Sequence, residues 1–217
     1  MHVLKKVTLC LGFLTLLHAE EGVSMLVQKG IELESYGYNK DALVLYTKAQ
    51  ENGDLLAMAF VGKMYLGGWG VKKDACRAVD DFELVISLAQ SDKEIAMLVA
   101  KVGLASAYAE GDCVLADGTK ALELIKEVLF ANGASDHAGM FHLENLQAGD
   151  FYKTPLRKEY IGLALYLLGN QMDPRLSLQK IRVDILEKAA EFGNRRAKRE
   201  LQTAGLRPPG PSQPKSK

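Results

Sequence analysis

The sequence predicts an all-α fold made of repeated helix pairs, and three observations carry this prediction. A segment near the middle of the chain recurs at a fixed offset of 43 residues. Small and apolar residues recur at helical spacing within each copy. The sequence contains no alternating run of β-branched residues with hairpin punctuation. We therefore expect helix pairs stacked one on the next.

The first element to separate from this fold is the N-terminal segment 1–19, which has the pattern of a secretory signal peptide. Lys5 and Lys6 precede an apolar run over 7–17, and small Ala19 stands before two acids. The run is about half of the ~20 residues that a membrane-spanning helix needs, so a permanent anchor is the less favoured alternative. We expect an exported, periplasmic or secreted protein without an integral membrane span.

The internal repeat defines the central helices. Seven positions match between the copy that begins at Ala57 and the copy that begins at Ala100. A weaker third copy places Ala138, Leu143 and Gly149 at equivalent positions. The matched pairs are Ala57/Ala100, Gly62/Ala105, Tyr65/Tyr108, Gly68/Gly111, Val71/Val114, Asp74/Asp117 and Ala78/Ala121.

Each copy predicts a first helix, a tight turn and a second helix. Gly68 and Gly70 supply a turn that can adopt a positive φ. Asp74 and Asp117 then stand where the second helices begin, which predicts helices over 74–88 and 117–131. Glycines close the second helices, at Gly53, Gly133 and Gly193.

Two segments complete the predicted organisation. Residues 188–197 repeat the pattern of 48–57, so a further copy begins near Asn194 and stays incomplete. The end of the chain, 206–217, holds four of the six prolines and is expected to be a disordered tail. The repeat region is therefore expected over 20–205.

The segment 48–74, KAQENGDLLAMAFVGKMYLGGWGVKKD, resembles the SEL-like repeat, a relative of the tetratricopeptide repeat. Gly62, Tyr65, the Gly-x-Gly-Val turn and Asp74 carry the resemblance, and the second copy departs from it with Cys113 at the place of Gly70. The resemblance covers about 22–205. It implies a right-handed α/α solenoid without chemistry of its own, used by exported members as an adaptor or assembly factor.

We expect the partner to be another protein or a peptide, bound along one side of the first helices. If Ala57, Val61 and Tyr65 face the neighbouring helix, the opposite side forms a mostly apolar strip. An alternative stays open, in which these side chains are ordinary core. The predicted partner-binding residues are Leu56, Ala59, Lys63, Leu66, Val99, Val102, Ser106, His137, Met140 and Glu144.

The two cysteines that remain after residue 19 suggest one disulfide. Cys76 falls in the second helix of one copy and Cys113 in the turn of the next, and stacking by one repeat would bring them side by side. Two separate buried thiols are the alternative. The chain is expected to be a monomer or a weak oligomer.

Signals for enzymatic chemistry are weak, so we expect a protein that is not an enzyme. Ser177 and Lys180 fit the S-x-x-K pattern of penicillin-binding enzymes, but no S-D-N or K-T-G element accompanies them. His137 and His142 lack the i, i+4 spacing of zinc-binding helices. We expect no metal and no cofactor. The alternatives are a cell-envelope hydrolase acting through Ser177 and an immunity-type protein that neutralises a secreted toxin.

Overall fold

The computed structural model describes residues 23–92, 94–137, 140–151, 153–171 and 179–206. The predicted segment 1–19 and, except for Leu206, the predicted tail 206–217 lie outside this part of the chain. The described elements are nine α-helices, two short strands and one 3₁₀ helix, and they follow in this order: α2 (Met25–Ser35), α3 (Asn39–Glu51), α4 (Leu55–Gly67), α5 (Ala75–Leu88), α6 (Ile95–Glu110), α7 (Gly118–Ala131), β1 (Ser135–His137), β2 (Met140–His142), η1 (Ala148–Phe151), α8 (Pro155–Gln171), α9 (Gln179–Glu191) and α10 (Arg195–Thr203).

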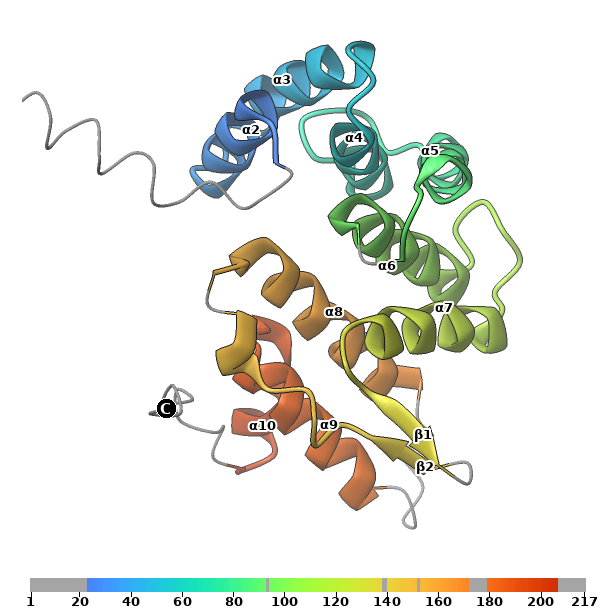
Figure 1. Cartoon of the computed structure of the whole chain (residues 1–217), viewed down its shortest axis with the longest axis vertical. Coiled ribbons are helices and arrows are strands. Elements are labelled where there is room, and N and C mark those ends of the chain that lie inside the picture. The colour runs from blue at the N-terminus through green and yellow to red at the C-terminus, as the bar shows by residue number, and fades with distance from the viewer. Residues whose placement is uncertain (1–22, 93, 138–139, 152, 172–178, 207–217) are drawn as a thin grey trace, which may run out of the picture.

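The helices pack in chain order as pairs, which confirms the predicted all-α class. Each first helix packs on its own second helix in the pairs α2/α3, α4/α5, α6/α7 and α8/α9. Successive pairs are joined by contacts of α3 with α4, α5 with α6, and α7 with α8, while α10 packs on α9. Figure 1 shows that α2 to α7 follow an arc and that α8 lies on its inner side.

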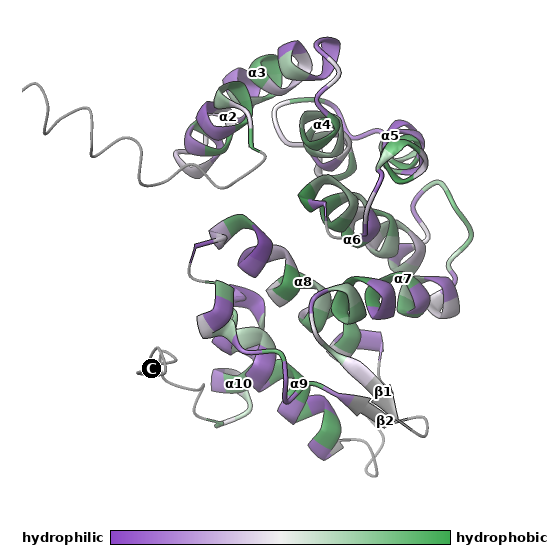
Figure 2. Ribbon diagram, viewed as in Figure 1, coloured by the Kyte–Doolittle hydropathy of each residue, from purple (hydrophilic) through white to green (hydrophobic). Residues whose placement is uncertain are grey.

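The core runs along the first helices of the pairs. α4 and α6 are apolar on nearly all sides, as Figure 2 shows, because α4 packs on α3, α5 and α6, and α6 packs on α4, α5, α7 and α8. Phe82 from α5 is fully buried, and its ring lies against the backbone at Gly62 and Gly103. Small residues at these two positions let α4 and α6 approach the ring closely.

The predicted turns of the repeat are confirmed in detail. Gly68 and Gly111 end the first helices in the left-handed region, with φ of 68° and 75°. The side chains of Asp74 and Asp117 accept hydrogen bonds from backbone N–H groups in the first turn of α5 and α7. These caps satisfy donors that have no partner within the helix, so both second helices begin where the sequence predicts.

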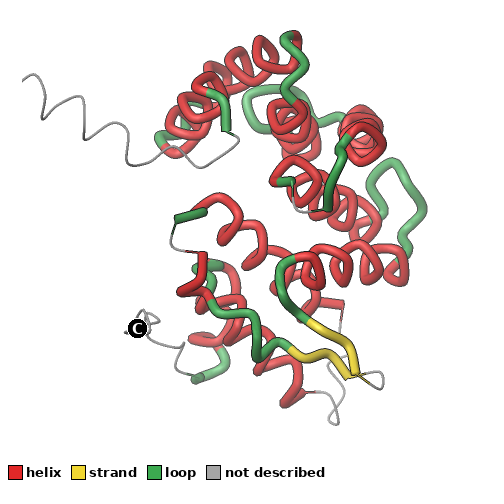
Figure 3. The backbone as a smooth tube through the Cα atoms, viewed as in Figure 1, coloured by secondary structure: helices red, strands yellow, loops and turns green. Residues whose placement is uncertain are grey.

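The third copy was predicted wrongly. A helix was expected near Leu143, but the described residues 135–137 and 140–142 form the antiparallel strand pair of β1 and β2, shown in Figure 3, and η1 follows. The first helix of this pair is α8, which begins at Pro155. Proline has no backbone N–H and is tolerated at the first position of a helix. Three matched residues without a continuous apolar face were too few to predict the position of the helix.

A helix, α10, begins at the place where the sequence predicts the start of a further copy. Asn194 caps α10 and accepts hydrogen bonds from the backbone N–H groups of Arg196 and Ala197. Asp54 caps α4 in the same way, by accepting from the N–H of Ala57 at 3.0 Å. The two helices therefore begin with the same kind of cap, and α10 packs on α9.

Candidate functional site

Four residues of the predicted apolar strip are core residues. Leu56 and Ala59 on α4 and Val99 and Val102 on α6 are between 0% and 3% exposed. Their side chains are covered because α4 and α6 have neighbouring helices on several sides. These four residues therefore do not form an open groove in this structure, and the alternative interpretation as core describes them.

The other predicted strip residues do not form one continuous surface. Leu66 and Ser106 are half-buried, and the Ser106 hydroxyl donates to the carbonyl of Val102 at 3.0 Å. His137 and Met140 pair with each other across the hairpin, and Glu144 is exposed after it. This part of the strip is displaced because the third copy is not a helix here.

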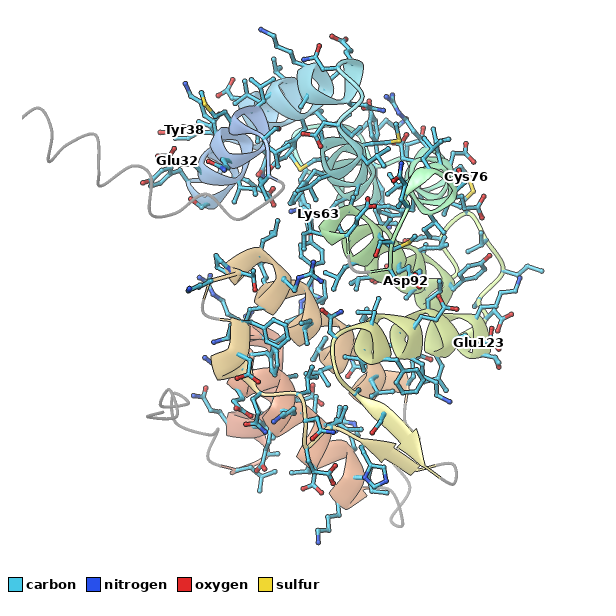
Figure 4. The ribbon with its side chains drawn as sticks, in the orientation of Figure 1. Glu32, Tyr38, Lys63, Cys76, Asp92 and Glu123 are labelled. Carbon is cyan, nitrogen blue, oxygen red and sulfur yellow. A yellow bond between two sulfur atoms is a disulfide. The ribbon has the colours of Figure 1, made fainter. Side chains whose placement is uncertain are left out.

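Lys63, a member of the predicted set, lines a cavity. The cavity has a volume of about 140 Å³ and lies between α2, α4 and α8. Figure 4 shows Lys63 on the inner side of the arc, facing α8. The lining residues are Ile31, Glu34, Ser35, Phe60, Lys63, Leu156, Glu159 and Tyr160.

The floor of this inner pocket is aromatic. Phe60 and Tyr160 are 1% and 5% exposed, and their ring centroids are 6.3 Å apart in an edge-to-face arrangement. Tyr46 stacks on Phe60, with a centroid distance of 4.9 Å. Such ring pairs stabilise beyond their buried area, so the floor is rigid and fixes α8 against α4.

Charged groups surround this floor. Lys63 Nζ lies 2.6 Å from Glu34 Oε1, and the hydroxyl of Tyr46 donates to Glu34 Oε2 at 3.1 Å. Lys63 also lies over the Phe60 ring, 4.7 Å from its centroid. Glu159 is exposed at the mouth and forms no ion pair with another described residue. The pocket therefore has one neutralised carboxylate and one unpaired carboxylate.

The pKa values are raised for Tyr160, which lines the pocket, and for Tyr46, which stacks on Phe60. Burial raises the pKa of the Tyr160 hydroxyl, and the charges of Glu159 and Glu34 raise it further. Burial and Glu34 raise the pKa of Tyr46 in the same way. Both hydroxyls are therefore protonated at neutral pH, and that of Tyr46 donates to Glu34.

The predicted disulfide is present in the structure. Cys76 and Cys113 are bonded, with their Cα atoms 4.9 Å apart. The bond joins the first turn of α5 to the turn between α6 and α7, as the stacking of one repeat on the next predicted. Figure 4 shows Cys76 on the outer side of the arc, away from Lys63.

Other predicted chemistry can be assessed only in part. Ser177 lies outside the described residues. Among the described residues, no group of three or more His, Cys, Asp or Glu side chains is placed to hold a metal ion. In the same part of the chain, no helix has the length and apolarity needed to cross a bilayer.

Comparison with known proteins found no match among protein-family models, curated proteins or solved structures. The resemblance to SEL-like repeats therefore rests on the residues of the sequence alone.

Sequence reasoning missed the pocket because it missed α8. One signal was present: Tyr160-Ile161-Gly162 has the same order of an aromatic, a β-branched residue and glycine as 60–62 on α4. That order would have identified α8 as a first helix and placed Tyr160 opposite Phe60.

Proposed function

We propose that the protein is a non-enzymatic adaptor or assembly factor that binds a partner protein on the inner face of its helix array. The observation that carries this proposal is the inner pocket. Its walls come from α2, α4 and α8, which are far apart in sequence, and its floor is held by buried aromatic contacts. A rigid concave site of this kind is typical of helical-repeat proteins that bind other proteins.

Two further parts of the proposal concern class and location. We propose that the array is a right-handed SEL-like solenoid and that the protein acts outside the cytoplasm. The Cys76–Cys113 bond supports the location, because disulfides persist in oxidising compartments. The signal-peptide pattern of 1–19 supports it independently. N-terminal sequencing of the exported protein tests the location, and a chain that retains residues 1–19 in the cytoplasm would contradict it.

Tryptophan substitutions at two similar serines, one at the pocket and one away from it, test the binding proposal. Ser35 lies at the pocket mouth, and its hydroxyl donates to the carbonyl of Glu32 at 2.7 Å. Ser87 on α5 makes the same kind of bond, to Leu84 at 2.8 Å, but does not line the pocket. Both side chains are exposed, so tryptophan at either position should leave the fold intact.

The experiment is crosslinking of the full-length chain in its own cells, followed by mass spectrometry. The wild type and Ser87→Trp should capture the same partner, with crosslinks on α2 or α8, and Ser35→Trp should lose at least nine-tenths of it. Equal capture by all three forms, or crosslinks confined to the outer side of the arc, would exclude the inner pocket as the binding site.

A further inference from the structure

We infer that the inner pocket accepts one lysine or arginine side chain presented by the partner protein. The inference deepens the proposed function and rests on it, because it names the chemistry that the partner brings to the site. It follows from the size of the pocket, its aromatic floor and the balance of charge at its mouth.

The size of the pocket selects a single side chain. Its volume of about 140 Å³ is close to the ~150 Å³ of an engineered cavity that admits one benzene molecule. Pockets for cofactors and other small molecules usually measure about 300–1,000 Å³. The inner pocket is therefore too small for a folded peptide segment or a nucleotide, and its dimensions fit one long side chain that enters from the mouth.

The aromatic floor suits the stem and head of a basic side chain. Lysine and arginine bury their methylene groups on apolar surfaces and place their cations over aromatic faces. The protein already uses this contact internally, because Lys63 Nζ lies 4.7 Å from the centroid of Phe60. Tyr160 is the second ring of the floor and meets Phe60 in an edge-to-face arrangement.

The charged groups that line the pocket determine whether it favours a cation or an anion. Lys63 is neutralised by Glu34 at 2.6 Å, whereas Glu159 has no ion pair with a described residue. The three groups together carry one excess negative charge. Burial is the largest cause of the raised pKa of Tyr160, and the charges of Glu159 and Glu34 add to it. An entering anion would be repelled, and an entering cation would pair with Glu159.

A titration followed by NMR tests the chemistry of the site directly. The probes are N-acetyl-lysine amide and N-acetyl-norleucine amide, which have stems of the same length but differ in charge. Lysine amide should shift the aromatic signals of Phe60 and Tyr160 at millimolar concentration, and norleucine amide should bind at least fivefold more weakly. Equal binding of the two probes would contradict the inference.

The matched variants are Glu159→Gln and Glu123→Gln. Both glutamates are exposed, and Glu123 lies on α7, on a part of the arc away from Lys63 (Figure 4). Glu159→Gln should weaken lysine-amide binding about tenfold, while Glu123→Gln should leave it unchanged. An unchanged affinity in Glu159→Gln, with an unchanged melting temperature, would overturn the role of this carboxylate.

The crosslinking experiment separates failure of the inference from failure of the proposed function. If Ser35→Trp loses the crosslinked partner but Glu159→Gln retains it, the adaptor function stands. The inference that the partner presents a basic side chain is then wrong. If lysine amide binds but no form captures a partner, the cation site stands and the adaptor function is wrong. If n-butylamine binds more tightly than lysine amide, the site is for a free amine, which overturns the side-chain inference.

Discussion

The two central repeats, α4/α5 and α6/α7, have the same turn but build it from different residues. In both, the backbone N–H of the capping aspartate donates to the carbonyl of a tyrosine at 3.0 Å, from Asp74 to Tyr65 and from Asp117 to Tyr108. A cation lies over each tyrosine ring, and these cations also stand at equivalent positions of the repeat: Arg77 and Lys120.

The instructive difference is at the equivalent positions Gly70 and Cys113. Both have a positive φ, of 72° and 66°, and Cys113 is the only residue other than glycine in that region among those that the structure describes. A Cβ at Gly70 would lie 2.6 Å from the backbone of Asn39, at the start of α3. The Cβ of Cys113 instead leads to a bond with Cys76, near the start of α5.

The comparison shows that the two turns share a backbone conformation at this position but have different residues there. At this position the turn of one repeat touches the first turn of the preceding second helix. Glycine allows the contact because it has no side chain, and cysteine makes the contact covalent. Substitutions at equivalent positions therefore test how much each residue contributes to the free energy of unfolding.

The largest expected effect is loss of the disulfide. The bond closes a loop with a sequence separation of 37, which the loop-entropy account values at about 4 kcal/mol, less any strain in the native state. The double variant Cys76→Ser, Cys113→Ser should lose about 2–4 kcal/mol in urea unfolding. The wild type in reductant should lose a similar amount. A variant as stable as the oxidised wild type would show that the bond does not hold the two repeats together.

The second expected effect is a pH dependence that comes from Asp81 on α5. The next repeat has Leu124 at this position, and one carboxylate oxygen of Asp81 is buried without a hydrogen-bond partner. Burial raises the pKa of Asp81, the charge of Arg77 partly opposes the shift and the charge of Asp80 adds to it, so that the pKa is about 6. The folded state therefore favours the protonated carboxyl.

The sign of the effect follows from this raised pKa. The stabilisation is fully present below the unfolded pKa of aspartate, near 3.9, and is lost as the pH rises through about 6. Because the side chain is partly exposed, we expect a loss of only about 1–2 kcal/mol. Asp81→Asn should remove this part of the pH dependence between pH 4 and 7.5 in thermal unfolding. An identical pH slope in the variant would contradict a raised pKa.

The central repeats could be predicted from sequence because each feature had a local physical cause. Positive-φ glycines, aspartate caps and helical spacing of small residues all act within a few residues. The disulfide followed from the same register, since stacking by one repeat fixes which turn meets which helix.

The region after α7 and the inner pocket could not be predicted in this way. The hairpin of β1 and β2 breaks the repeat offset, so the register that located α4 and α6 fails for α8. The pocket depends on Tyr160 meeting Phe60, a contact between residues about one hundred positions apart. Some residues of the predicted strip, such as Val99, are buried because α6 has several neighbouring helices.

The third expected effect isolates the backbone conformation at position 113. In a Cys76→Ser background, Cys113→Gly restores the residue that the preceding repeat has at Gly70. Glycine adopts a positive φ without the clash that a Cβ makes there, an advantage of about 1 kcal/mol. The double variant with glycine should therefore be about 1 kcal/mol more stable than the one with serine. If serine is equally stable, the turn relaxes once the disulfide is gone.

The smallest expected effect concerns Lys101 on α6, which replaces Met58 of the preceding repeat. Lys101 is 7% exposed, and its Nζ lies 2.7 Å from Asp92 and 2.8 Å from Glu127. Burial lowers its pKa, but the hydrogen bonds to the two acids outweigh burial, so the pKa is raised. Asp92 and Glu127 are themselves more than half exposed.

Lys101→Met should therefore change the free energy of unfolding by less than about 1 kcal/mol at neutral pH. Methionine fills the space of the buried stem, and the two acids return to water without leaving a buried charge unpaired. Above the ordinary pKa of lysine the wild type should lose the stabilisation from these bonds, whereas the variant should not. Lys101→Ala is the control for packing and should cost more than methionine. A large loss in Lys101→Met at neutral pH would mean that the ion pairs, and not the packing of α6, hold this repeat to its neighbours.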